Sequence, residues 1–153
     1  MTRRMLALLF AFTAGAIVGH VAIPSVRAQA QAHKSMFMTR LYTGPDNQTH
    51  AEEVEVKFGN PGEAFKLMQV TGAELRRGAA GTVSDWHRGP RRQYVITLSG
   101  RGEVEVAGGK KISLEPGHID LVEDTTGKGH ITRSTGTEDR VTLTLPLADQ
   151  SGK

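Results

Sequence analysis

The side chains of this chain best suited to bind a metal or a polar ligand are those of His87, Gln93 and His130. Neutral imidazole is a common ligand for zinc, iron, copper and nickel. The amide of Gln93 can supply one weak oxygen ligand, or it can hydrogen-bond an organic ligand in a site without metal. Each of the three could also be an ordinary polar residue, so their chemistry depends on the elements that carry them.

The sequence around these residues predicts strands. Between Gln93 and Gly100 lies YVITLS, whose tyrosine, isoleucine and leucine alternate with the other residues, as in a half-buried strand. We therefore expect Gln93 to open a strand and His87 to lie in the loop before it. After a second hairpin and a turn at residues 116–117, another strand is expected to carry His130.

The spacing of these residues resembles the two-part motif of the cupin superfamily. The first part is matched at its first glycine, first histidine, acidic position and last glycine by Gly81, His87, Gln93 and Gly100. The second part is matched in shortened form by Pro116, Gly117 and His130. Residues 86–93 and 123–130 also resemble a narrower group of small bacterial single-domain cupins. Over residues 81–145 the resemblance implies an all-β fold, a small antiparallel jelly-roll barrel.

The same resemblance implies a metal site formed by His87, Gln93 and His130, for one divalent ion of iron, manganese, nickel or zinc. The chain departs from the family pattern where Gly89 replaces the second histidine, Gln93 the acidic ligand and Ser134 an asparagine. Because an amide carries no charge to offset that of the metal, we expect the ion to be held loosely.

Three arginines and the single tryptophan stand close to this set. An anionic ligand would explain Arg88, Arg91 and Arg92, and Arg91 and Arg92 are our candidates to contact it. The alternative is that these arginines balance nearby acids at the surface, and the sequence favours that alternative. Trp86 is expected to wall the ligand pocket, unless its ring packs in the core, as such rings commonly do.

Two acids precede the second histidine of the set. Glu123 and Asp124 could orient that imidazole by hydrogen-bonding its other nitrogen. They could equally flank a surface turn.

These residues leave three functions open. The first is a cupin that binds a small molecule together with a metal; as an enzyme it would be a metal-dependent dioxygenase or isomerase. The second is a metal-free module that binds or senses a small ligand. The third is a structural cupin that acts through dimer association.

The first thirty residues predict a cleavable signal peptide. Two arginines precede the apolar run 5–18, and the small-residue pattern at 28–30 suits a signal peptidase. The mature protein would begin at Gln31 in the periplasm or outside the cell, without stable membrane insertion. An uncleaved membrane anchor is the alternative, although the run is short for a span. Export could use the Sec or the twin-arginine route.

Charge and composition narrow the class of partner. The leader holds three arginines and no acid, so 16 of the 19 basic residues remain in the mature chain, against 16 acidic ones. A balanced charge argues against nucleic-acid binding, which depends on neutralising phosphates. The chain has no cysteine, which excludes disulfides and thiolate ligands.

The rest of the sequence predicts one domain at residues 36–146, between short tails at 31–35 and 147–153. Strands are expected at 36–43, 50–58, 65–75, 103–106, 110–114 and 141–145, with turns at 44–47, 59–62 and 108–109. Val104 and Val106 should face inward and their glutamate neighbours outward. A homodimer is expected, paired through the early strands between Met36 and Phe58.

Overall fold

The computed structural model describes residues 35–149, which form an all-β unit. Its elements, in chain order, are β1 (Met36–Thr43), β2 (Thr49–Val56), β3 (Glu74–Gly78), β4 (Val83–His87), β5 (Gln93–Ser99), β6 (Arg101–Glu105), the short 3-10 turn η1 (Ala107–Gly109), β7 (Lys111–Leu114), β8 (Ile119–Glu123), β9 (His130–Thr135) and β10 (Arg140–Pro146). The predicted signal peptide and most of both predicted tails lie outside the described residues. In the described part, no helix is long and apolar enough to cross a membrane.

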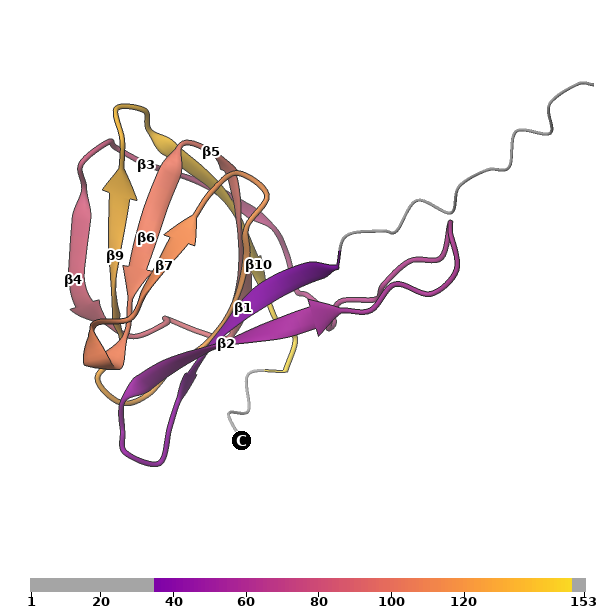
Figure 1. Ribbon diagram of the computed structural model, residues 1–153, viewed down its shortest axis with the longest axis horizontal. Helices are drawn as coiled ribbons and strands as arrows, with labels where there is room; N and C mark the ends of the chain where they lie inside the picture. Colours follow the sequence, from indigo (N-terminus) through magenta and orange to yellow (C-terminus); the bar gives the residue numbers. More distant parts are fainter. Residues whose placement is uncertain (1–34, 150–153) are drawn as a thin grey trace, which may run out of the picture. The chain divides into compact units, whose positions relative to one another are not determined.

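The strands form two sheets that face each other (Figure 1). A cavity lies between them. The larger sheet has the order β2-β1-β8-β5-β10-β3, and the smaller has the order β4-β9-β6-β7. The described strand pairs are antiparallel apart from β1 and β8, which run parallel. This pair departs from the expected all-antiparallel arrangement. It is possible because β1 and β8 are far apart in the chain and are not joined by a hairpin.

Several predicted strand boundaries are confirmed. The first strand covers 36–43, Gln93 opens β5, and His130 opens β9. The predicted turn at 44–47 is closed by a hydrogen bond from the Asn47 amide to the Gly44 carbonyl, 3.0 Å long. The turn between β6 and β7 places both of its central glycines at φ of 75° and 76°, where a side chain would be strained.

Two local predictions are wrong. Residues 65–73 do not form the expected strand, and within them only Val70 makes an isolated bridge, to Leu147. The large apolar side chains of this run are 36 to 40 % exposed. They are not packed into a core, so burial does not favour a strand here. His87 does not lie in a loop but ends β4, a strand that the sequence analysis did not predict.

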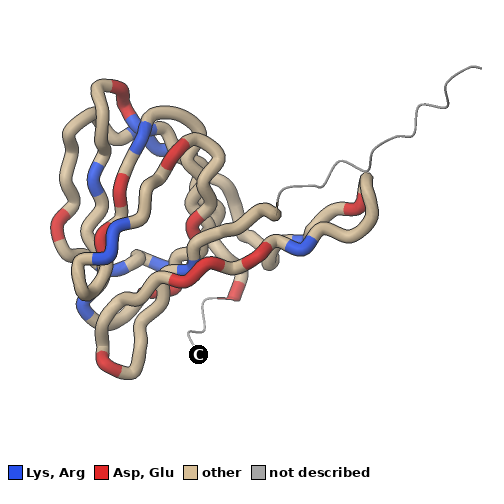
Figure 2. Tube along the Cα trace, in the orientation of Figure 1, with Lys and Arg blue, Asp and Glu red and all other residues tan. Residues whose placement is uncertain are grey.

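The smaller sheet confirms the predicted direction of the β6 side chains. Val104 and Val106 are each 2 % exposed and pack with Leu41, Leu114 and Val122 in the interior. Glu103 faces the other way and forms ion pairs with Lys111 (3.0 Å) and Arg133 (3.2 Å). Basic and acidic positions are interspersed in this way along the described strands (Figure 2).

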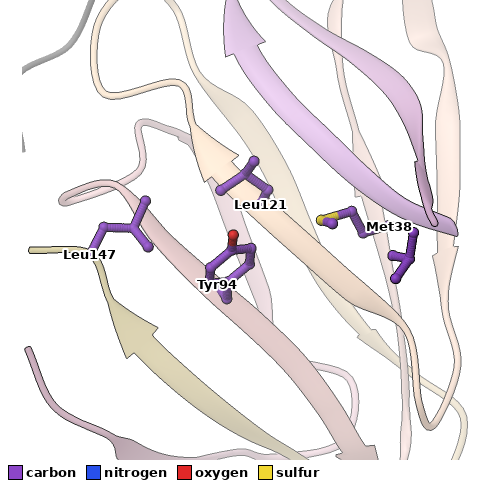
Figure 3. Packing of buried hydrophobic residues seen from close by; sticks show 5 residues of the cluster. Met38, Tyr94, Leu121 and Leu147 are labelled. Atoms are coloured by element: carbon purple, nitrogen blue, oxygen red, sulfur yellow. The ribbon is translucent and has the colours of Figure 1, made fainter. Parts of the chain in front are cut away.

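A second apolar cluster lies on the outer face of the larger sheet. Its buried members are Met38, Val56, Tyr94, Leu121 and Leu147 (Figure 3). Tyr94 and Leu121 each stand between residues that line the cavity, and successive side chains of a strand point to opposite faces. The apolar alternation that predicted β5 is therefore its outer face, whereas Gln93, Val95 and Thr97 form the inner one.

Candidate functional site

The two sheets enclose a cavity of about 520 Å³. His87, Gln93 and His130 all line this cavity, so the structure brings together the three residues chosen from the sequence. They come from three strands: the last residue of β4 and the first residues of β5 and β9.

Strand pairing places the two imidazoles side by side. His87 and His130 are direct partners in the antiparallel β4–β9 ladder, where opposite side chains lie on the same face. Their ring centroids are 4.5 Å apart, with an interplanar angle of 59°. His130 is buried and His87 is half-buried.

Both imidazoles have their Nδ1 atoms held by acceptors. His130 Nδ1 lies 2.5 Å from Asp124 Oδ2, and His87 Nδ1 lies 2.8 Å from the main-chain oxygen of Asp85. A carbonyl or carboxylate oxygen accepts, so each Nδ1 carries the proton and donates it. The lone pair of each neutral ring is then on Nε2, which leaves that nitrogen able to bind a metal while the other N–H donates a hydrogen bond, as in metal-binding histidines.

Asp124 lies directly behind His130, in the position that one of the two alternatives from the sequence gives it. Its carboxylate is fully buried, and its Oδ2 also accepts a hydrogen bond of 2.9 Å from the Thr49 hydroxyl. Its Oδ1 has no hydrogen-bond partner among the described residues. The buried carboxylate is therefore stabilised by two hydrogen-bond donors to Oδ2, the imidazole N–H and one hydroxyl.

Glu123, the other acid predicted to orient His130, points away from the cavity. It is hydrogen-bonded by Arg92, from Nε at 3.0 Å, and by Arg40, from Nε at 2.6 Å. Burial raises the pKa of Glu123, but the hydrogen bonds and charges of the two arginines together lower it by more. The resulting pKa lies below its ordinary value of 4.5. The prediction for Glu123 is wrong because neighbouring residues of a strand face opposite sides.

Gln93 presents a buried acceptor to the cavity. The side chain is 7 % exposed, and its Oε1 has no hydrogen-bond partner in the described part of the chain. A buried polar atom without a partner is costly, and such an atom in a cavity wall is a position where a ligand or metal would compensate the cost.

Gly89, at the family's second histidine position, leaves no room for a side chain. A Cβ there would lie 2.6 Å from Val122 Cγ1 and 3.3 Å from Asp124 Oδ1. The Gly89 amide also donates to the Asp124 main-chain oxygen over 3.1 Å. The backbone at this point supports the Asp124 loop, so the donor set consists of two imidazoles and an amide. In the described residues, no group of three histidine, cysteine or acidic side chains could hold a metal.

The residues predicted to contact a ligand, Trp86, Arg91 and Arg92, are not among those that line the cavity. Arg91 pairs with Glu74 and Arg92 with Glu123. These two arginines therefore balance nearby acids, which is the alternative that the sequence favoured. Trp86 precedes His87 on β4 and therefore faces the other side of the sheet. Its ring is covered by the Lys128 ammonium, 3.7 Å from the ring centroid.

A buried arginine in the cavity wall was not among the residues predicted from the sequence. Arg140 opens β10, is 9 % exposed, and donates from Nη2 (2.9 Å) and Nε (3.3 Å) to the Thr97 hydroxyl. Burial lowers the pKa of Arg140 below its ordinary value, while the charge of Asp120 raises it. The signal that could have found it is its position in the strand: Arg140 shares its face of the strand with Thr142 and Thr144, which also line the cavity.

Comparison with known proteins finds likeness in structure and none in sequence. No family model matches the chain, and no curated protein matches it significantly. Among solved structures, the Cnp3 cupin domain of Schizosaccharomyces pombe is 17% identical over 75% of this chain and 86% of its own, with a TM-score of 0.40. An RmlC-like cupin protein from Desulfovibrio desulfuricans is 20% identical over 59% and 95%, with a TM-score of 0.37.

Proposed function

We propose that this chain is a single-domain cupin that binds a small organic molecule in its cavity, together with a divalent transition metal held by His87, His130 and Gln93. One observation carries the proposal. Two imidazoles whose Nε2 atoms have no hydrogen-bond partner among residues 35–149, and an amide oxygen that likewise has none there, line the same cavity.

The donor set fits a loosely held ion. Two nitrogen ligands and a neutral oxygen suit iron, manganese, nickel or zinc, but they bring no negative charge to the first coordination shell. Asp124 supplies a charge one step away, through His130, and thereby increases the basicity of that imidazole. Positions not taken by these three residues would remain for water or the organic ligand.

When bound, a metal at this site would act as a Lewis acid or as an oxygen-activating centre, so an enzyme of this kind would be a dioxygenase or an isomerase. The residues of the chain have supporting tasks. Asp124 and the Asp85 carbonyl fix the protons on Nδ1, and the side chains of Val95 and Val122 keep one wall of the cavity apolar.

A metal-free binding module is the second candidate. It is favoured by the same Gln93, whose amide would then hydrogen-bond an organic ligand directly. The third candidate, a structural cupin with its interior filled by side chains, fits less well, because about 520 Å³ of the interior is open.

Titration calorimetry on untagged protein separates these candidates. Wild type, Gln93→Glu and His130→Ala are titrated with Fe(II), Mn(II), Ni(II) and Zn(II). We expect weak binding by wild type, tighter binding by Gln93→Glu, whose carboxylate adds the missing charge, and none by His130→Ala. If neither wild type nor Gln93→Glu binds any of these metals, the metal site is refuted and the metal-free module remains.

We further propose that the protein is exported to the periplasm or beyond, and that it forms a homodimer. The first proposal rests on the sequence, since residues 1–34 lie outside the described part, and the second on the resemblance to small cupins and on the edge formed by the early strands. Mass spectrometry of the exported protein should find Gln31 at the N-terminus, and an intact Met1 or Thr2 would refute cleavage.

A further inference from the structure

We propose that the molecule bound in the cavity is an organic carboxylate, and that the guanidinium of Arg140 binds its carboxylate group. The inference rests on the proposal above that the cavity binds a small molecule. It does not require that a metal is present.

Arg140 is a buried cation whose hydrogen-bonding capacity is largely unused. A guanidinium has five N–H donors, and the two hydrogen bonds of its side chain that the structure contains both go to the Thr97 hydroxyl. Among the described residues, no carboxylate lies within ion-pair distance of it; Asp120 acts on it only through its charge. Because a buried charge is costly unless it is paired, an anion in the cavity would complete this environment.

The neighbouring backbone is shaped to admit this side chain. A Cβ on Gly102 of β6 would lie 2.9 Å from Arg140 Cδ and 3.0 Å from its Nε. Any larger residue at 102 would therefore displace the guanidinium. Arg140 thus occupies a defined place in the wall of the cavity, unlike an arginine extended into solvent.

The guanidinium and the histidine pair mark opposite ends of the cavity. Thr97, the partner of Arg140, is four residues along β5 from Gln93, a rise of about 13 Å at 3.3 Å per residue. Between them the wall includes Val95 and, on the facing sheet, Val104. A ligand anchored at Arg140 therefore needs a body several atoms long to reach the histidines, and the two valines favour carbon atoms where it passes them.

The charge of the cavity favours a monoanion. Arg76, Arg77 and Arg88 also line it, against the single acid Asp120, but Arg76 and Arg77 are already paired with Glu74 (2.9 Å) and Asp139 (4.0 Å). A carboxylate matches the planar fork of one guanidinium with two parallel hydrogen bonds. A phosphate dianion would meet stronger repulsion from the buried Asp120 carboxylate.

Three six-carbon probes test the inference by titration calorimetry on the metal-free full chain: hexanoate, hexanamide and hexyl phosphate. We expect hexanoate to bind about tenfold more tightly than hexanamide, in line with the contribution of a charged hydrogen-bonded pair. Arg140→Gln should remove that preference, and Arg140→Lys should keep part of it. Arg101→Gln, which alters an exposed arginine paired with Glu115 outside the cavity, should leave it unchanged.

The controls separate this inference from the metal proposal. Circular dichroism verifies the fold of each variant, and Zn(II) titration of Arg140→Gln should match wild type, because the histidines are untouched. Hexanoate binding that persists without any metal uptake leaves the role of Arg140 standing and refutes only the metal. The inference is overturned if hexanoate fails to bind, binds no better than hexanamide or binds less tightly than hexyl phosphate, or if folded Arg140→Gln or Arg140→Lys keeps the full wild-type preference.

Discussion

Asp124 is the residue on which the geometry of the candidate metal site most depends. Its carboxylate is fully buried, holds the Nδ1 proton of His130 and is held in turn by the Thr49 hydroxyl. Replacing it with the neutral Asn removes the charge while keeping the size of the side chain. The imidazole then loses the group that fixes its tautomer and increases its basicity.

We therefore expect Asp124→Asn to lower Zn(II) affinity about 10- to 100-fold, as measured by titration calorimetry. Asp85→Asn is the matched control, because Asp85 holds the other imidazole through its main-chain oxygen and its side chain accepts from the Trp86 amide instead. That variant should bind Zn(II) as wild type does. Equal affinities for wild type and Asp124→Asn would contradict the proposed role of the carboxylate.

Glu123 makes a testable contribution to stability that depends on pH. Its pKa in the folded protein is lowered below 4.5, so its stabilising effect is present above pH 4.5 and is lost as the pH falls through the folded value. We expect Glu123→Gln to reduce the free energy of unfolding by about 1 to 3 kcal/mol at pH 7. Urea titrations should show the gap to wild type closing as the pH falls below 4.5 and through the lowered pKa of the folded state.

The control for this measurement is Glu52, which pairs with the same Arg40 at 2.9 Å but is about half exposed. Since exposed ion pairs contribute little, Glu52→Gln should cost less than about 1 kcal/mol. A gap between wild type and Glu123→Gln that does not change with pH would show that the carboxylate acts through packing and not through charge.

Single residues also show what the sequence can and cannot predict about the site. His87, Gln93 and His130 could be chosen because their type and spacing match a family motif. Trp86 was misplaced because His87 was expected in a loop; once both residues are known to lie on β4, neighbours on a strand are expected to face opposite sides. Arg140 was missed because arginine is rarely buried, and its phase on the strand becomes meaningful only once the inner face is known.

Among the elements, β6 packs against the side chain of Arg140, the residue proposed to bind the ligand carboxylate. Gly102 faces Arg140 on one side, and a Cβ there would also come within 2.8 Å of the Arg133 main-chain oxygen. Backbone cannot move away as a flexible side chain can. The strand therefore needs glycine at this position for reasons of space, whatever its cost in conformational entropy.

Gly102→Ala should accordingly lower the free energy of unfolding by about 1 to 3 kcal/mol, the usual cost of overpacking, and weaken hexanoate binding. Thermal and urea denaturation followed by circular dichroism measure the first effect. Gly72→Ala is the control, because no atom lies within 4 Å of the Cβ it would add. Equal stability of Gly102→Ala and wild type would mean that β6 has more room beside Arg140 than its geometry indicates.

The strands could be predicted from alternating apolar and polar residues, and the buried face could be predicted only where the apolar side chains all face the interior. In β6, apolar residues alternate with charged ones, and the apolar side is the inner one. In β5 the apolar series lies on the outer face, where Tyr94 is buried, Ile96 is half-buried and Leu98 is exposed, because the larger sheet carries apolar residues on both faces. Alternation therefore located the strand but could not show which of its faces lines the site. That depends on which face the second sheet covers, which the sequence of β5 does not show.

At the scale of the whole molecule, β2 and β3 are the edges of the larger sheet. An edge strand presents unpaired N–H and C=O groups that another chain can use. Near the β2 edge, the rings of Phe37 and Phe58 are 48 % and 57 % exposed. These features support the proposal of a homodimer paired through residues 36–58.

Light scattering at micromolar concentration should therefore give twice the chain mass for wild type. The double variant Phe37→Ser/Phe58→Ser should shift toward the monomer, because it removes apolar area that pairing would bury while leaving the described strands their backbone hydrogen bonds. Val83→Ser, which changes a residue equally exposed on β4 of the smaller sheet, should stay dimeric. A monomeric wild type would refute the dimer, and loss of the dimer in Val83→Ser alone would place the contact on the smaller sheet instead.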